Sequence, residues 1–334
     1  MKETTDDNMN VVYRENYGGP EVISLNQLSI PVIGENDVLI RVHATTVNRT
    51  DCAILRAKPF IMRFFIGLFK PKQKVPGTDF SGLIEQVGES VSTFRVGDRV
   101  MGFNDQGICS QAEYMSFSER KDIFKMPEGL SFRSAAASME GAHYALNIIN
   151  KVKIVSGQKI LINGATGAIG SALVQFCKAD GLDVTAVCKG EHQTLVTNLG
   201  AHKVLNYLEN DFTQLDEKFD FVFDAVGKST FGKCKRILTP KGIYISSELG
   251  PWSQNIFFAL IGLFSKGKKV IFPIPTHIDR SYEYVRGLIE KGQFKPLIDR
   301  SYPMTEAADA YRYVMSGEKV GNVILDLKEN PVPI

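Results

Sequence analysis

The segment NGATGAIG, residues 163–170, has the residue types of a phosphate-binding loop. It follows a short apolar run at 160–162, which predicts a strand, and leads into a run at 167–179, which predicts a helix. In such a loop small residues let a pyrophosphate approach the backbone, and the first N–H groups of the helix are free to bind phosphate. The segment therefore predicts a dinucleotide site. Its predicted contact residues are Ala165, Thr166, Gly167, Ala168, Ile169 and Gly170.

Three positions in this loop have separate roles. Gly167 and Gly170 suit the close approach of the cofactor and the packing of the helix on the sheet. Ala165 takes the tight-turn position, which a small residue can fill if its φ stays negative. Because a glycine motif alone is weak, a strand–helix turn in another α/β fold is the alternative. The order of strand, loop, long apolar helix and second strand favours a dinucleotide.

The end of the next predicted strand, 184–187, indicates which dinucleotide is bound. A carboxylate there would accept hydrogen bonds from the adenosine ribose, whereas a nearby cation suits a 2′-phosphate. The residues at this point are Cys188 and Lys189; Asp183 lies at the wrong end of the strand, and Glu191 lies beyond it. The sequence therefore predicts NADPH, and an ordinary solvated lysine at 189 is the alternative.

The elements around the loop alternate between strand and helix from about residue 157, which predicts right-handed βαβ units and a parallel sheet covered on both faces. The first third of the chain is instead rich in short strands separated by turns, which predicts a compact β domain. Its predicted strands are 38–42, 82–87, 99–103 and 112–117. The last sixty residues are mixed, with predicted helices at 282–291 and 305–316 and a strand at 322–327.

Composition limits the classes of partner and compartment. The 334 residues include 39 basic and 37 acidic ones, a net charge of +2 that predicts no nucleic-acid partner. No apolar run is long enough for a membrane span, and the polar N-terminus does not resemble a signal peptide. Five scattered cysteines, with no CxxC pair, are typical of reduced thiols, so we expect a cytoplasmic protein.

Five segments spread along the chain carry a resemblance to a known family. They are VNRTDCAIL (47–55), PGTDFSGLIEQVGESVSTFRVGDRV (76–100), GQKILINGATGAIGSALVQF (157–176), FDFVFDAVG (219–227) and GNVILDL (321–327). In their order they resemble the medium-chain dehydrogenase/reductase superfamily. The resemblance covers residues 11–327 and implies an α/β protein with a GroES-like β-rich catalytic domain, residues 1–127 and 274–334. It also implies a Rossmann NADP-binding domain with a doubly wound parallel sheet, residues 128–273.

The positions of zinc ligands in this superfamily carry other residues in this chain. Asn48 replaces a cysteine, Thr78 replaces the histidine of a GHE motif, and no cysteine lies near Ala137. The loop of four cysteines for a structural zinc is represented only by Cys109. Because an amide and a hydroxyl are poor zinc ligands, we expect no metal. The chain resembles the zinc-free quinone oxidoreductase-like branch, which implies a homodimer.

This branch implies residues near the reaction. Asn48 would lie beside the nicotinamide and hydrogen-bond a substrate carbonyl, and Asp51 would join a proton relay or only brace the loop. Thr78 is a further hydrogen-bond donor. His143 falls at a threonine position of relatives, where it would donate a proton or simply fill space. The resemblance adds Tyr207, beside the adenosine phosphate, and Val226 and Gly227 to the cofactor contacts.

The implied reaction is hydride transfer from NADPH to a quinone or an α,β-unsaturated carbonyl, without zinc. A reductase or dehydrogenase of simple aldehydes, ketones or alcohols is one alternative, and an NADPH-binding sensor or partner protein with little turnover is another. The apolar segments 60–69 and 255–264 favour a small hydrophobic carbonyl or quinone as substrate. We expect them to form walls of the substrate pocket or a subunit interface rather than a membrane-surface helix.

Overall fold

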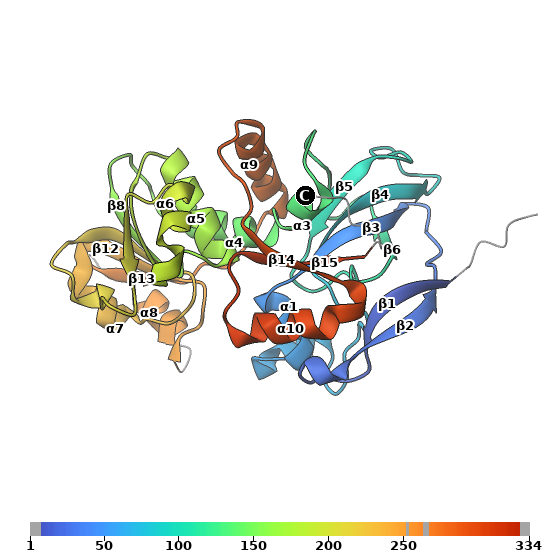
Figure 1. Cartoon of the computed structure of the whole chain (residues 1–334), viewed down its shortest axis with the longest axis horizontal. Coiled ribbons are helices and arrows are strands. Elements are labelled where there is room, and N and C mark those ends of the chain that lie inside the picture. Colours follow the sequence, from blue (N-terminus) through green and yellow to red (C-terminus); the bar gives the residue numbers. More distant parts are fainter. Residues whose placement is uncertain (1–7, 252–253, 263–266, 328–334) are drawn as a thin grey trace, which may run out of the picture. The chain divides into compact units, whose positions relative to one another are not determined.

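The computed structural model describes residues 8–251, 254–262 and 267–327. The chain forms two compact units (Figure 1). The first comprises the residues up to Glu140 and those from Ile298 onward, and the second comprises Gly141–Leu297. In the described ranges, no helix is both long and apolar enough to cross a membrane.

The first unit is built on a seven-stranded sheet whose long central strand is β3 (Asp37–Val47). Alternate side chains of this strand, such as Val38, Ile40 and Val42, enter an apolar core because successive residues of a strand point to opposite faces. β1 (Asn8–Arg14) and β2 (Ile23–Ser29) pair separately as an antiparallel ribbon. The other strands of the main sheet are β4 (Asp79–Val87), β5 (Arg99–Phe103), β6 (Tyr114–Ser118), β7 (Ile123–Lys125), β14 (Ile298–Pro303) and β15 (Asn322–Asp326).

Helices from both ends of the chain complete this core. α1 (Arg49–Arg56) and α10 (Ala307–Ser316) lie side by side in Figure 1, and Leu55, Tyr311 and Val314 belong to the same apolar cluster. The short helix α3 (Phe132–Ala136) begins at Ser131, whose hydroxyl caps the N–H of Ser134, and it packs over β3 and β4.

The second unit has a six-stranded sheet in which every neighbouring pair is parallel. Side chains of β8 (Lys159–Asn163) alternate between two cores: Ile160 and Ile162 join the cluster that includes α5 (Ala168–Ala179), and Leu161 joins the cluster on the other face. Both faces are therefore covered, as predicted for a doubly wound fold. The strand order is β10 (Lys203–Asn206), β9 (Asp183–Cys188), β8 (Lys159–Asn163), β11 (Phe219–Asp224), β12 (Leu238–Ser246) and β13 (Lys269–Ile271).

The two units differ in their bounds from the predicted domains 1–127 with 274–334 and 128–273. Residues 128–140 group with the β-rich unit because α3 packs on its sheet. Residues 274–297 group with the parallel-sheet unit because α9 (Ile278–Glu290) and the turn after it bury Val285, Leu288 and Phe294 in the core beside α5. The predicted α/β class, with one β-rich unit and one parallel-sheet unit, is confirmed.

Candidate active site

Three of the four predicted catalytic residues meet where β3 passes into α1. Asn48 is the N-terminal cap of α1, and the Asp51 Oδ2 atom accepts a hydrogen bond of 2.8 Å from the Asn48 backbone N–H. This is the return contact of a capping box, which braces the start of a helix. The Thr78 hydroxyl donates to Asp51 Oδ1 at 3.3 Å. All three side chains are buried.

The side chain of Asn48 is held in one orientation by groups on every side. Lys319 Nζ donates to Asn48 Oδ1 at 3.1 Å, and Asn48 Nδ2 donates to Thr46 Oγ1 at 2.9 Å and to Asn322 Oδ1 at 3.2 Å. Because an ammonium can only donate, the amide atom that faces Lys319 must be the oxygen. Both N–H groups of Asn48 therefore already have acceptors, whereas the sequence suggested that one would bind the substrate carbonyl.

A second buried carboxylate anchors the far end of this chain of hydrogen bonds. Asp79 accepts from the Thr46 backbone N–H at 2.8 Å and from the Thr46 hydroxyl at 2.7 Å. Burial raises the pKa of Asp79 well above its usual range. Donation thus runs from Lys319 through Asn48 and Thr46 to Asp79, which orders all four polar groups.

Glu140 and Lys319 give the cluster its opposite charges. Glu140, at the start of α4 (Glu140–Ile149), accepts a 2.5 Å hydrogen bond from the Thr50 hydroxyl, and burial raises its pKa against the opposing effects of Thr50 and Lys319. Burial, and secondarily the charge of Glu140, raises the pKa of Asp51 to about 8. Burial lowers the pKa of Lys319, a half-buried side chain, to about 8. Acidic and basic groups that exchange protons near neutrality are characteristic of catalytic sites.

Five members of this cluster were not predicted as site residues from the sequence: Thr46, Asp79, Glu140, Lys319 and Asn322. Asp79 had a detectable signal, because it follows Thr78 directly in the GTD motif. Lys319 had none, because 271 residues separate it from Asn48 along the chain and only the fold brings them together.

His143, the fourth predicted catalytic residue, lies in the second unit on α4. Its Nδ1 atom is 2.8 Å from the Ser281 hydroxyl of α9, and the Asn147 amide is 3.4 Å away. Burial lowers the pKa of His143 to about 4, so the imidazole is neutral at neutral pH. This environment suits a packed, hydrogen-bonded histidine better than a proton donor.

The donor set at Asn48 and Thr78 does not fit a zinc ion. The Asn48 oxygen faces the Lys319 ammonium, which a second cation would have to displace, and the Thr78 hydroxyl faces Asp51. Catalytic zinc takes thiolate, imidazole or carboxylate ligands. Within the described ranges, no group of three or more Cys, His, Asp or Glu side chains has an arrangement that could hold a metal ion.

The predicted phosphate loop connects β8 to α5. Gly164 adopts a left-handed φ of +81°, and a Cβ atom there would lie 2.8 Å from the Val226 Cβ. A Cβ on Gly170 would lie only 2.0 Å from the Gly164 carbonyl oxygen. The left-handed φ of the turn therefore belongs to Gly164. Ala165 lies in the same turn without a positive φ, as the sequence analysis required of an alanine there, and its side chain is buried in the core.

The start of α5 has the geometry that phosphate binding requires. Gly167 occupies the cap position and offers no side chain to the first N–H groups of the helix. Residues Thr166, Gly167, Ala168 and Ile169 are partly accessible. The Gly167 N–H donates to the Gly164 carbonyl at 3.1 Å, and the N–H groups that follow it at the start of α5 carry the positive end of the helix dipole. The residues present therefore fit a dinucleotide pyrophosphate.

The end of β9 has no carboxylate directed to the position of a ribose. Cys188 is buried, with its Sγ 3.2 Å from the Lys189 carbonyl oxygen. Lys189 is half-buried, and its ammonium lies 3.9 Å from a Glu191 carboxylate oxygen. Tyr207, just after β10, is 47% exposed. A cation and an accessible aromatic ring thus lie near the strand ends where the adenosine part of a dinucleotide binds.

Asp224, at the end of β11, organises the loop that contains Val226 and Gly227. Its carboxylate accepts from the Gly227 N–H at 2.9 Å, from the Tyr244 hydroxyl at 2.9 Å and from the Asn163 amide at 3.0 Å. Asn163 immediately precedes Gly164, so one buried carboxylate connects the ends of two neighbouring strands. The sequence signal for it was an acidic residue at the end of an apolar strand.

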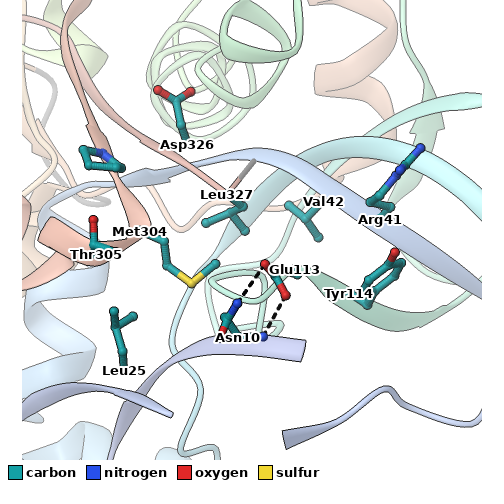
Figure 2. A pocket seen from close by; sticks show the side chains of 11 residues that line it. Asn10, Leu25, Arg41, Val42, Glu113, Tyr114, Met304, Thr305, Asp326 and Leu327 are labelled. Carbon is teal, nitrogen blue, oxygen red and sulfur yellow. Dashed lines mark hydrogen bonds between the residues drawn. The ribbon is translucent and has the colours of Figure 1, made fainter. Parts of the chain in front are cut away.

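A pocket of about 440 Å³ opens elsewhere in the first unit (Figure 2). Glu113 in its wall accepts hydrogen bonds from the Asn10 backbone and side chain, and Asp326 forms a 2.9 Å ion pair with Arg133. Its acidic groups are thus already paired within the chain. None of the predicted site residues lines this pocket, so its volume does not locate the chemistry.

Both apolar segments present large side chains at the surface. In the first, Phe60, Ile61, Phe64, Phe65, Leu68 and Phe69 are exposed. In the second, α8 (Gln254–Gly262) exposes Ile256, Phe257, Leu260 and Ile261, and residues 263–264 lie outside the described ranges.

Comparison with known proteins agrees with this architecture. Residues 34–141 match the alcohol dehydrogenase GroES-like domain, and residues 199–325 match the family described as zinc-binding dehydrogenase. The chain is 29% identical to a quinone oxidoreductase of Mus musculus over 334 residues, which covers 92% of this chain and 95% of the relative. It is 28% identical to a 2-methylene-furan-3-one reductase of Solanum lycopersicum, covering 95% of this chain and 78% of the relative.

The solved structure of the quinone oxidoreductase from Coxiella burnetii has the same fold. Its TM-score to this chain is 0.85 at 24% sequence identity, over 96% of this chain and all of that one. The fold, the order of the two matched domains and the relatives along nearly the whole chain agree. The chain therefore belongs to the medium-chain dehydrogenase/reductase superfamily, in its quinone oxidoreductase-like branch.

Proposed function

We propose that this protein is a zinc-independent, NADPH-dependent reductase that transfers a hydride to a quinone or an α,β-unsaturated carbonyl. Membership of the superfamily makes it an oxidoreductase with a nicotinamide dinucleotide cofactor. The observation that carries the proposal of zinc independence is the position of the Lys319 ammonium, 3.1 Å from Asn48 Oδ1. Asn48 stands where the zinc-dependent members of the superfamily have a metal ligand. A fixed cation there replaces the electrostatic role of a metal.

The relatives support the substrate class. One is named a quinone oxidoreductase and another a 2-methylene-furan-3-one reductase. Quinones and conjugated enones share an electrophilic carbon in conjugation with a carbonyl group. Hydride addition to either places negative charge on oxygen, so both need a hydrogen-bond donor and then a proton.

Lys319 is the group in the described cluster that best meets this need. NADPH, when bound, supplies the hydride. Two of the three Lys319 N–H groups contact Asn48 Oδ1 and the Gly321 carbonyl oxygen, which aims the ammonium and leaves a third donor. Lys319 would donate this proton to the substrate oxyanion and recover one from water, while its contacts with the Asn48 and Gly321 oxygens hold the ammonium group in place.

Lys189 supports the choice of NADPH. It follows Cys188 at the end of β9, where a carboxylate would favour NADH, and it is accessible to a 2′-phosphate. The test is calorimetric titration of wild type and Lys189→Ala with NADPH and NADH. We expect the variant to lose at least tenfold in NADPH affinity and little in NADH affinity, since an ion pair with phosphate is worth about 1.5–3 kcal/mol. Unchanged affinities, or tighter NADH binding by wild type, would contradict the assignment.

A substrate panel on metal-stripped protein tests the reaction. We expect NADPH oxidation with naphthoquinones and cinnamaldehyde-type enones and little with saturated aldehydes. Near-stoichiometric zinc in purified protein, with activity lost on chelation, would contradict zinc independence. Activity mainly on saturated aldehydes would support the simple-carbonyl alternative, and tight NADPH binding without turnover would support a sensor.

A further inference from the structure

The segment that follows α1 exposes an unusual density of large apolar side chains. It comprises a 3₁₀ turn, Phe60–Met62, and the short helix α2 (Arg63–Ile66), followed by an extended stretch. Soluble proteins rarely expose contiguous patches of this kind without a partner. We call these side chains the 60–69 platform: Phe60, Ile61, Phe64, Phe65, Leu68 and Phe69, which are 43% to 85% exposed.

The backbone beneath the platform is well held. The Gly67 N–H donates to the Arg63 carbonyl at 3.0 Å, and the Tyr17 hydroxyl donates to the Gly67 carbonyl at 2.7 Å. The Arg63 guanidinium lies over the Tyr17 ring, 5.0 Å from its centroid. The aromatic side chains are therefore presented on a fixed base and do not fold back into the core.

The charge around the platform has one sign. Between Cys52 and Thr78 the chain has no acidic residue and six basic ones. Two of these basic residues pair with Glu15, which is 3.6 Å from Lys70 and 2.8 Å from Lys74. The basic residues are Arg56, Lys58, Arg63, Lys70, Lys72 and Lys74.

The exposed apolar side chains and the surrounding positive charge together indicate which kind of partner would bind the platform. A two-fold contact between copies would bring identical strongly basic segments against each other, which like-charge repulsion opposes. Exposed phenylalanines with a rim of lysines instead match the interface of an anionic bilayer, where the rings insert and the ammonium groups stay among the headgroups. We propose that the 60–69 platform is a docking surface for anionic phospholipid membranes, in place of the pocket wall or subunit interface that was expected from the sequence.

Sedimentation of the full-length protein with vesicles tests this proposal. We expect binding to vesicles of equal phosphatidylglycerol and phosphatidylcholine, weaker binding to phosphatidylcholine alone, and release by high salt. The double variant Phe65→Asp/Phe69→Asp should lose about tenfold or more in partitioning. The matched control, Val32→Asp/Val96→Asp, changes two exposed apolar residues elsewhere in the same unit, 96% and 60% exposed, and should bind as wild type does.

A second pair of variants separates local charge from net charge. Lys58→Glu/Lys70→Glu should weaken binding to the anionic vesicles, whereas Lys151→Glu/Lys153→Glu, with the same change of net charge, should not. Thermal unfolding of each variant checks that it remains folded. Equal losses in both charge pairs, or unchanged binding by Phe65→Asp/Phe69→Asp, would overturn the proposal. So would absence of vesicle binding together with self-association that those phenylalanine changes abolish, because the platform would then be a contact between copies.

Discussion

Lys319 is the residue to which the proposed function assigns the most specific chemical role. It donates to Asn48 Oδ1 and to the Gly321 carbonyl, and its lowered pKa of about 8 makes it a better proton donor than an ordinary lysine. We therefore expect Lys319→Met to lower kcat at pH 7 by about a hundredfold, the lower end of general-acid effects. NADPH affinity, measured by fluorescence titration, should change little.

Arginine at the same position is the informative control for this prediction. Lys319→Arg keeps the positive charge but does not lose its proton in the accessible pH range. The wild-type kcat should fall as pH rises through about 8, and that alkaline limb should be absent in the arginine variant, whatever its absolute rate. The same alkaline limb in both proteins would exclude Lys319 as the titrating donor.

Asp51 should make the free energy of unfolding depend on pH. Burial raises its pKa to about 8 in the folded chain, from an ordinary value of 3.8, so the folded state binds this proton more tightly than the unfolded state does. This contribution to stability is complete below about pH 4 and is lost as pH rises through about 8. Asp51→Asn removes the titration, so urea denaturation should show the variant gaining stability relative to wild type between pH 5 and pH 8.

The comparison must be between the two proteins because other buried groups also titrate. His143, whose pKa is lowered by burial to about 4, makes stability rise with pH in the acid range, which opposes the effect of Asp51. That contribution is common to wild type and variant and cancels in the difference. A difference in unfolding free energy that is constant across pH would show that folding does not shift the pKa of Asp51.

At the scale of elements, the sequence predicted correctly those helices and strands whose formation depends on residues close to one another along the chain. The apolar runs at 160–162 and 167–179 became β8 and α5 to within a residue or so, because strand and helix periodicities depend on near neighbours. The predicted strand 38–42 became the longer β3, Asp37–Val47, because pairing with β4 and β15 extends it to Val47. Long-range pairing of this kind has no local signal.

The turn residue of the phosphate loop illustrates the same limit. Spacing alone identified Ala165 as part of the turn, but not that Gly164 takes the left-handed φ and that Val226 from another strand closes the space around it. Similarly, Asn48, Asp51 and Thr78 could be named from motifs, whereas Lys319 and Glu140 join them only through tertiary packing. The sequence could therefore predict the parts of the site contributed by local motifs, and the structure adds the charges that surround them.

Two helical glycines allow a controlled test of the loop. Gly170 in α5 has the Gly164 carbonyl oxygen 2.0 Å from its ideal Cβ position, whereas Gly287 in α9 has nothing within 4 Å. Gly170→Ala must push the loop away from the helix and should cost stability and NADPH affinity together. Gly287→Ala should stabilise the chain by about 0.5–1 kcal/mol, because alanine has a higher helix propensity than glycine.

Thermal unfolding with and without NADPH measures both effects of these glycine variants. If Gly170→Ala has the same unfolding temperature and the same NADPH affinity as Gly287→Ala, the close approach of helix and loop is not a structural requirement. If it is destabilised but binds NADPH with wild-type affinity, the loop relaxes without changing the phosphate site.

For the whole molecule, the main difference from the sequence prediction is the placement of α9. Phe176 of α5 contacts the rings of Tyr284 and Phe294, each with centroids 5.2 Å apart. The buried Gln175 amide donates to the Lys295 carbonyl at 3.0 Å and accepts from the Lys295 N–H at 2.9 Å. Residues 274–297 therefore supply both apolar cover and hydrogen bonds to the parallel-sheet unit.

Two fragments test this division directly. A fragment of residues 141–297 should unfold cooperatively, because it keeps the whole apolar cluster around α5. A fragment of residues 128–273 lacks α9, so it exposes Phe176 and removes both hydrogen bonds between the Gln175 amide and Lys295. This loss is comparable to several large-to-small core substitutions at about 3–5 kcal/mol each. Since a domain of this size has a net stability of only about 5–15 kcal/mol, we expect no cooperative transition from the shorter fragment. Calorimetry of both, with Phe294→Ala in the longer fragment as an intermediate case, distinguishes the two boundaries. A cooperative transition for 128–273 at the temperature of 141–297 would assign α9 to the β-rich domain, as the sequence had suggested.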